Sequence, residues 1–344
     1  YYILIIYKTI RLIMNKNRIF IKNNMIKAGV IGIGHLGSIH LKLLNESIHF
    51  SVIGCFDNNF ESKNKLPDTI PFFKDLNELV AKCDAVFICS ITPSHFEIAK
   101  NCLEKNKHVF IEKPITTSVD EAELLVKLSK KKKLIGQVGH VERFNPAISS
   151  VISSIDDPKF IECHRLAEFN PRGNDVSVVL DLMIHDIDIV LKLVDSDVKD
   201  VKANGVCIIS NTPDITNARV EFKNGCVANF TASRISLKNM RKSRFFQNEA
   251  YIAVDFLEKK SEIVKISDFH GTDNYAMLIE NAEGDKKQIY YNSPETKSVN
   301  AIEEEHKDFA NSILHNKVPQ VSFKDGLRAL KLAKLIIDKV NENS

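Results

Sequence analysis

The chain has 344 residues, which is more than a domain with a single hydrophobic core usually contains and is enough for two domains. Hydrophobic residues make up 44% and charged residues 26%, and a net charge of +3 is too small to indicate a nucleic-acid or membrane-surface partner. The seven cysteines lack CxxC or Cys/His spacing, which argues against a disulfide framework and favours a reducing, cytoplasmic compartment.

The first 24 residues look unlike the rest of the chain. The apolar run over residues 1–7 is interrupted by Lys8 and Arg11, so no stretch of ~20 apolar residues forms that could span a membrane. The placement of charge and the lack of a small-residue cleavage site do not fit a signal peptide. We predict a disordered or mis-assigned leader over residues 1–24, with a weak membrane anchor as the alternative.

From Met25 to about residue 143, short apolar runs alternate with amphipathic segments. This pattern predicts helices at residues 36–44, 76–80, 94–104 and 119–131, and strands at 28–33, 50–56, 85–90, 108–111 and 134–138. Strands that alternate with helices form parallel βαβ units, so we expect residues 25–143 to fold as a Rossmann domain with a doubly wound parallel sheet.

Beyond residue 143, predicted strands follow one another directly. One helix is expected at 176–194, and strands are expected at 201–209, 218–222, 227–233, 250–256 and 262–266. Asn224-Gly225, between two of these strands, is a strong hairpin signal. We therefore predict an α+β substrate-binding and oligomerisation domain over residues 144–322, with a large, mostly antiparallel open sheet. Two further helices are predicted at 302–314 and 324–340. Residues 323–344 are expected to pack back on the rest of the protein.

A glycine-rich loop joins the first predicted strand to the first helix. Its G-x-G-x-x-G spacing permits a tight turn, backbone approach to a pyrophosphate and close packing of helix on strand, while the helix N-terminus offers free N–H groups to the anion. The loop consists of Gly32, Ile33, Gly34, His35, Leu36 and Gly37. This loop predicts a dinucleotide cofactor.

Asp57 follows 20 residues after Gly37, at the end of the second predicted strand. A carboxylate in that position accepts hydrogen bonds from the adenine ribose, although Asp57 also suits a simple turn. Because this carboxylate would repel a 2′-phosphate and no arginine follows it, we expect NAD as the cofactor in preference to NADP.

Three further motifs follow the glycine loop in a fixed order. They are Thr92-Pro93-x-His95, then Glu112-Lys113-Pro114 after a predicted strand, and the D-x-x-x-H pair of Asp181 and His185. With the glycine loop, this ordered set resembles the Gfo/Idh/MocA family of oxidoreductases, from Met25 to the last helix. The resemblance implies that Thr92, His95 and Glu112 lie beside the cofactor, and that the Lys113–Pro114 bond is a fixed, often cis, turn.

The same resemblance gives roles to Lys113, Asp181 and His185. Lys113 lies at the carboxyl edge of the predicted sheet, where it can donate to a substrate hydroxyl and stabilise an alkoxide. Asp181 and His185 are four residues apart on one face of a predicted helix. The unperturbed pKa of histidine suits a general base, so we expect His185 to take the hydroxyl proton and Asp181 to orient it.

Residues 138–147 resemble a narrower branch of the family, which oxidises nucleotide sugars such as UDP-N-acetylglucosamine at C3. We expect the phosphates of such a substrate to be bound by Arg143, Arg165 and Arg172. His140 and Asn145 are expected to line the same binding site. The resemblance also implies a homodimer or homotetramer that pairs through the open sheet face.

Alternatives to this interpretation stay open. The substrate could be a free polyol, an inositol or a cyclic diol, and the chain could also be an NAD-binding sensor without catalysis. A metal site around Asp181, His185, Asp186 and Asp188 is not expected, since no cluster of further ligands accompanies them.

Overall fold

The structure is a computed structural model that describes residues 25–67, 69–170, 176–268, 277–280, 284 and 286–342. The chain divides into two compact units, each built from two segments. The Rossmann unit runs to Gly139 and also contains Ile302–Phe323, and the sheet unit contains His140–Ala301 and the segment that begins at Lys324. The sequence instead placed residues 302–322 in the second domain. The predicted leader and Arg172 lie outside the described residues.

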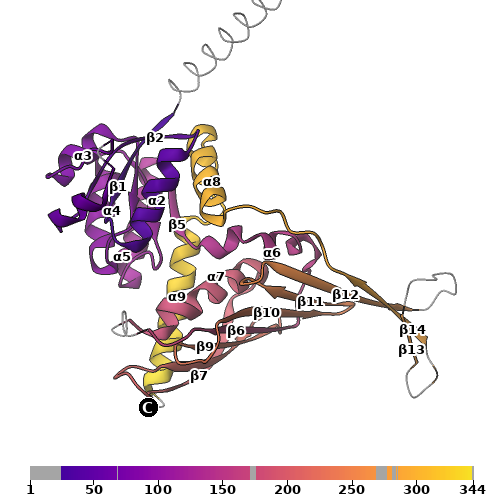
Figure 1. Ribbon diagram of the computed structural model, residues 1–344. Helices are drawn as coiled ribbons and strands as arrows, with labels where there is room; N and C mark the ends of the chain where they lie inside the picture. Colours follow the sequence, from indigo (N-terminus) through magenta and orange to yellow (C-terminus); the bar gives the residue numbers. More distant parts are fainter. Residues whose placement is uncertain are drawn as a thin grey trace, which may run out of the picture. The chain divides into compact units, whose positions relative to one another are not determined.

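The Rossmann unit has the predicted doubly wound sheet, with five parallel strands in the order β2-β1-β3-β4-β5. The strands are β1 (Ile26–Ile31), β2 (Phe50–Phe56), β3 (Ala85–Ile88), β4 (His108–Glu112) and β5 (Gly136–Gly139). Figure 1 shows β1, β2 and β5 of this sheet with the helices α2 (His35–Glu46), α3 (Leu76–Lys82), α4 (His95–Glu104) and α5 (Val119–Lys132). Short 3₁₀ segments lie at η1 (Phe60–Lys65) and η2 (Thr92–Ser94).

Helix α8 (Ala301–His315) completes the core of the Rossmann unit. Its Phe309 is fully buried and packs against Phe50, Phe87 and Phe110 of the parallel strands. The residues after α8 extend the contact, because Val138 of β5 donates its N–H to the Val321 carbonyl at 3.0 Å. The apolar surface of the parallel strands is thus covered by a segment from near the other end of the chain.

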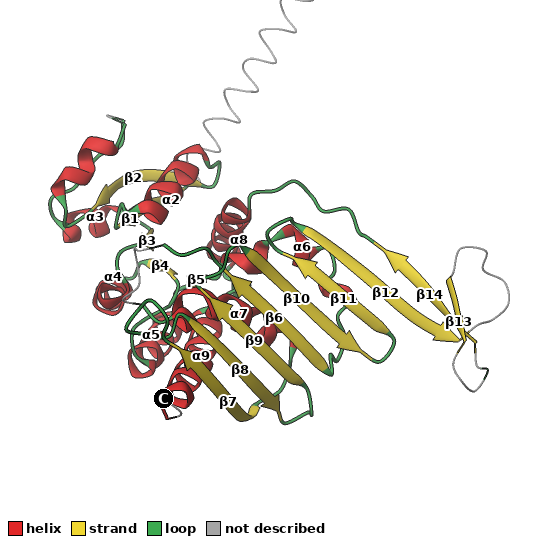
Figure 2. Ribbon diagram, turned by 60° about the horizontal axis from the view of Figure 1, so that its bottom comes forward, coloured by secondary structure: helices red, strands yellow, loops and turns green. Residues whose placement is uncertain are grey.

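The sheet unit contains a nine-stranded sheet in the order β13-β14-β12-β11-β10-β6-β9-β8-β7 (Figure 2). All neighbours are antiparallel except β6 and β9, which confirms the expected mostly antiparallel sheet. The strands are β6 (Phe160–Leu166), β7 (Val198–Val206), β8 (Ile215–Phe222), β9 (Val227–Ser233), β10 (Met240–Gln247), β11 (Ala250–Asp255), β12 (Lys260–Asp268), β13 (Met277–Glu280) and β14 (Lys286–Asn292).

Two central strands, β6 and β10, were missed by the sequence prediction. Every second residue of β6 is buried, but charged residues such as Glu162 and Arg165 interrupt the apolar pattern. The Asn224-Gly225 hairpin is confirmed between β8 and β9, where Gly225 has φ of +89°, a conformation that favours glycine.

One face of this sheet packs against α7 (Ile184–Leu193) and α9 (Phe323–Glu342), as Figure 2 shows. The shorter helical segments are η3 (Val141–Phe144), α6 (Pro146–Ser149), η4 (Ile152–Ser154) and η5 (Val179–Met183). In the described part of the chain, no helix combines the length and hydropathy of a membrane span.

Candidate active site

The glycine loop follows β1 and leads into α2, as the sequence predicted. Gly32 has φ of +86°, and a Cβ there would lie 2.5 Å from the backbone of Ser90. A Cβ on Gly37 would lie only 1.9 Å from the Gly32 carbonyl oxygen, so this glycine is required for α2 to approach the loop. The space around Gly34 is open, since a Cβ there would have no neighbouring atom within 4 Å. This combination fits a dinucleotide pyrophosphate.

The first turn of α2 is also suited to an anion. Gly34 is the N-cap and has no capping side chain, and no acidic residue lies in the first turn. His35 and Leu36 are exposed there, with their backbone N–H groups at the positive end of the helix dipole. A pyrophosphate is the natural acceptor for such groups.

Asp57 lies at the end of β2, next to the glycine loop. Its Oδ2 accepts the Ile33 N–H at 2.6 Å, and its Oδ1 accepts the Asn59 N–H at 2.8 Å. The carboxylate therefore caps a local turn, as one interpretation of the sequence expected, and it keeps lone pairs for further donors. Its contact with the adenine ribose stays a prediction.

A pocket of about 620 Å³ opens beside Asp57, and we call it the cofactor pocket. It is lined by residues that follow three neighbouring strands, including Gly34 after β1, Asp57 after β2 and Ser90 after β3. The sheet order reverses between β1 and β3, and open α/β sheets bind ligands at such switch points.

The Thr92-Pro93-x-His95 motif forms η2 and the start of α4. Ile91 and Pro93, on either side of Thr92, line the cofactor pocket. His95 instead points inward, and its two ring nitrogens each lie 3.0 Å from a carbonyl oxygen, of Ser90 and of Pro114. Burial lowers the pKa of His95 although these contacts oppose the shift, so a neutral ring donates to one carbonyl at a time. His95 thus holds the turn that follows Lys113.

Lys113 follows β4 at the carboxyl edge of the parallel sheet, and its bond to Pro114 is cis. Its backbone N–H donates to Oε2 of Glu112 at 3.1 Å. Glu112 is turned inward and is only 8% exposed. A Cβ on Gly139, at the end of β5, would lie 2.8 Å from Oε1 of this carboxylate, so the two strand ends pack around Glu112.

Behind Glu112 lies a hydrogen-bonded chain that the sequence did not predict. Glu112 Oε1 lies 2.8 Å from His40 Nε2, and His40 Nδ1 lies 2.7 Å from His306 Nε2. We call these three residues the histidine chain. His40 on the buried face of α2 could have been flagged as a polar residue among apolar neighbours, but its partner is 266 residues away in the sequence.

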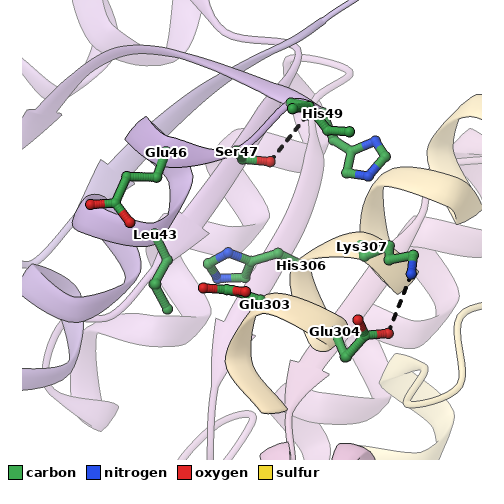
Figure 3. Close-up of a pocket in the computed structure, with 9 residues that line it drawn as sticks. Leu43, Glu46, Ser47, His49, Glu303, Glu304, His306 and Lys307 are labelled. Atoms are coloured by element: carbon green, nitrogen blue, oxygen red, sulfur yellow. Dashed lines mark hydrogen bonds and ion pairs between the residues drawn. The ribbon is translucent and has the colours of Figure 1, made fainter. Parts of the chain in front are cut away.

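His306 also lines a surface pocket of about 400 Å³, which we call the α2–α8 pocket. In Figure 3 its ring extends from α8 toward α2, with Leu43 and Glu46 on the opposite side and His49 above. All of these residues belong to the Rossmann unit.

Asp181 and His185 lie in the sheet unit, where the structure corrects the predicted helix. Residues 179–183 form a π-helical turn (η5), and regular α-helix begins only at Ile184. π-turns often occur at functional sites, since the wider turn changes which side chains share a face. Both residues are half-buried, and the His185 ring lies edge-on to His140 with centroids 6.4 Å apart.

Arg165 is buried and is held by two carboxylates. It donates to Asp186 of α7 at 2.8 to 3.2 Å and to Glu142 of η3 at 2.8 Å. Burial alone would lower the pKa of Arg165, but these two carboxylates raise it. This geometry argues for an organising role in place of the expected contact with substrate phosphates.

Arg143 and Asn145 are likewise held by hydrogen bonds to neighbouring groups of the protein. Arg143 makes a bidentate contact with Asp188 at 2.6 and 2.8 Å, and its side chain is 5% exposed. Asn145 donates to Glu142 and to the Phe256 carbonyl and caps the short helix α6. We call Arg143, Arg165, Glu142, Asp186 and Asp188 the arginine cluster; it joins α7, which carries His185, to η3 and β6. Over the described residues, no group of three or more His, Cys, Asp or Glu side chains is arranged to hold a metal ion.

Comparisons with known proteins agree with this architecture. The Gfo/Idh/MocA family model described as an oxidoreductase family with an NAD-binding Rossmann fold matches residues 26–140, and the Gfo/Idh/MocA C-terminal domain model matches residues 148–252. The chain is 35% identical over 240 residues to UDP-N-acetylglucosamine 3-dehydrogenase from Acidithiobacillus ferrooxidans, covering 69% of this chain and 76% of that protein.

Structural comparison extends this similarity. A solved structure of the Acidithiobacillus ferrooxidans enzyme matches with a TM-score of 0.82 at 30% identity, over 92% of this chain and 98% of that one.

A second relative is more distant in sequence. Myo-inositol 2-dehydrogenase from Thermotoga maritima is 24% identical over 89% of this chain and 93% of that protein. With both domains matched in order and a relative 35% identical over most of its length, the chain belongs to the Gfo/Idh/MocA family of oxidoreductases and carries its NAD-binding Rossmann domain.

Proposed function

We propose that this protein is an NAD-dependent dehydrogenase that oxidises a hydroxyl carbon of a nucleotide sugar, with C3 of UDP-N-acetylglucosamine as the first candidate. The observation that carries the proposal is the 35% identity over 240 residues to the Acidithiobacillus ferrooxidans enzyme named for that reaction. The glycine loop, Asp57 and Lys113 of this chain supply the corresponding cofactor and proton chemistry.

Three side chains handle the substrate hydroxyl in this proposal. Bound nicotinamide supplies the hydride acceptor. His185 takes the hydroxyl proton at Nε2, because its Nδ1 is a buried atom and imidazole titrates near working pH. The Lys113 ammonium stabilises the oxygen as it gains negative charge, and Asp181 orients His185. Glu112 and His95 position Lys113 through its backbone N–H and the Pro114 carbonyl.

Turnover can be tested with purified protein, NAD⁺ and a panel of UDP-sugars and inositols. Formation of NADH is followed by absorbance, and the mass of each sugar reports the loss of two hydrogen atoms even if the cofactor is recycled in place. Lys113→Ala should lower kcat by about 10²- to 10⁴-fold, in the range typical of a positioned proton-handling group. Lys127→Ala, which removes an exposed lysine of α5, is the matched control and should change nothing.

The same panel separates the alternatives. Turnover of inositols and not of UDP-sugars would favour the second candidate, which the match to 93% of the Thermotoga maritima inositol enzyme supports. If no sugar or polyol is oxidised and Lys113→Ala retains biological activity, the NAD-binding sensor replaces both dehydrogenase proposals.

The preference for NAD rests on Asp57 and can be tested separately. Asp57→Asn keeps an acceptor for the Ile33 N–H but removes the charge that repels a 2′-phosphate. The ratio of kcat/KM with NADP to that with NAD should rise about tenfold or more, equivalent to ~1.4 kcal/mol. Asp75→Asn, at a carboxylate that caps α3 in the same way, should leave the ratio unchanged. A ratio unaffected by Asp57→Asn would assign the cofactor preference to other residues.

A further inference from the structure

The histidine chain runs through an apolar part of the Rossmann unit. His40 is 1% exposed and His306 is 3% exposed. Phe87 and Phe110 pack against both imidazole rings, with ring centroids 5.1 to 6.3 Å apart, and Phe50 packs edge-on to His306. These aromatic rings keep solvent from the sides of the chain, so its two ends are the routes by which a proton can enter or leave.

The two ends of the chain lie in different surroundings. At one end, Glu112 accepts the backbone N–H of Lys113, at the carboxyl edge where the cofactor pocket opens. At the other end, His306 lines the α2–α8 pocket (Figure 3). Since Nε2 of His306 contacts His40, Nδ1 is the ring nitrogen that the following proposal assigns to water in that pocket.

We propose that His40 and His306 form a proton relay, through which His40, the hydrogen-bond partner of the Glu112 carboxylate, gains or loses a proton to solvent in the α2–α8 pocket. His40 and His306 are positioning residues in this scheme: they fix the orientation of the Glu112 carboxylate beside Lys113, and the relay sets the charge of the imidazole next to that carboxylate. The relay itself does not depend on a substrate, whereas its part in turnover rests on the proposed function.

The relay moves one proton without a co-reactant. In the first state, His40 carries protons on both ring nitrogens, and its Nδ1–H donates to Nε2 of His306. Transfer of this proton breaks the Nδ1–H bond of His40 and forms an Nε2–H bond on His306, while Nδ1 of His306 releases its proton to pocket water. In the second state both rings are neutral with protons on Nε2, and Glu112 is an anion throughout.

The charges around the chain are consistent with these two states. Burial alone would raise the pKa of Glu112, but the hydrogen bond and charge of His40, together with Lys113, lower it. Burial and the charge of His40 both lower the pKa of His306 far below its usual value, which keeps this ring neutral between transfers. The charge of Glu112 also acts on His95 and on the Cys89 thiol, and Glu305 acts on the same thiol.

The relay can be tested by NMR on protein labelled with ¹⁵N-histidine, in the absence of cofactor and substrate. The measured quantity is the rate at which the ring N–H protons of His40 exchange with solvent. His306→Gln keeps a hydrogen-bonding group next to His40 but cannot pass a proton through, so exchange at His40 should slow by about tenfold or more. Adding imidazole to His306→Ala should restore fast exchange.

His49→Gln is the matched control, because His49 lines the same pocket and lies outside the hydrogen-bonded chain. It should leave the exchange rate unchanged. In the wild-type protein the ring N–H protons of His40 should exchange faster than the buried backbone amides of β1 and β3, which need unfolding to exchange; this readout does not depend on any variant folding.

Equal exchange rates in the wild type and His306→Gln, equal slowing by His49→Gln, or wild-type exchange at His40 as slow as that of the buried amides would each overturn the relay. None of these measurements requires turnover. If the protein oxidises no nucleotide sugar, the proposed function is wrong, but the exchange measurements still test the relay.

Discussion

The Rossmann unit and the sheet unit both bury a polar network, and the two networks are built from different chemistry. The histidine chain contains two imidazoles, whose ring nitrogens can each donate or accept a proton along the hydrogen bond that joins them. In the arginine cluster both cations are guanidinium groups, which stay charged at any physiological pH. The first network can change its charge, and the second holds a constant one.

This difference matches what each network supports. The histidine chain ends at the carboxylate beside Lys113, the ammonium that stabilises the developing oxyanion in the proposed reaction, so a change in the charge of His40 would act close to that oxygen. The arginine cluster joins the helix that carries His185 to η3 and β6, where a fixed geometry is needed. Buried ion pairs are weak evidence of net stability, but removing one partner from such a pair is costly.

The largest effect is therefore expected in the arginine cluster. Arg165→Leu leaves Asp186 and Glu142 buried without their main cation and should lower the free energy of unfolding by about 3–5 kcal/mol. Arg241→Leu removes the half-exposed arginine that lies 3.6 Å from the same Glu142 and should cost less than about 1 kcal/mol. Urea unfolding at pH 7 measures both. Similar midpoints for the two variants would show that burial does not distinguish these arginines.

A smaller effect is expected in the histidine chain. His40→Leu removes the N–H donor from a buried carboxylate and should cost about 1–3 kcal/mol. His40→Gln, whose amide can still donate to Glu112, should retain much of that stability. If the two variants were equally unstable, packing of the ring against Phe87 and Phe110 would outweigh its hydrogen bond.

The smallest effect concerns the dependence of stability on pH. The folded-state pKa of His306 lies below 6.5, so beneath that pH the unfolded chain binds a proton that the folded chain does not. The stability of the wild type relative to His306→Gln should therefore fall as the pH drops through this window, by about 1 kcal/mol between pH 6.5 and 5.5. A difference that stays constant over this range would mean that His306 titrates alike in both states.

Local patterns in the sequence predicted much of the fold. The alternation of strands and helices predicted the doubly wound sheet, and the glycine spacing predicted the loop at its switch point, because both depend on neighbouring residues. The strand β6 was missed because a charged residue, Arg165, occupies one of its buried positions, and β10 was missed because its two buried residues include the polar Ser243. The π-turn before Ile184 was missed since a helical period does not show where one extra residue is accommodated.

The candidate site was predicted less completely, for a physical reason. Arg143 and Arg165 were assigned to substrate phosphates, but a sequence does not show that Asp188 and Asp186 lie within hydrogen-bonding distance of them. Likewise, His40 and His306 meet only because α8 packs on the parallel sheet. Long-range pairing of charges is set by the tertiary fold, and local spacing does not report it.

The return of residues 302–323 to the Rossmann unit also constrains the order of folding. During synthesis, the five parallel strands leave the ribosome long before α8, so Phe50 and Phe87 lack their Phe309 cover until nearly the whole chain has been made. An N-terminal fragment ending at Gly139 would expose this aromatic surface. We therefore expect the nucleotide-binding half to mature late and to be prone to aggregation when translation stops early.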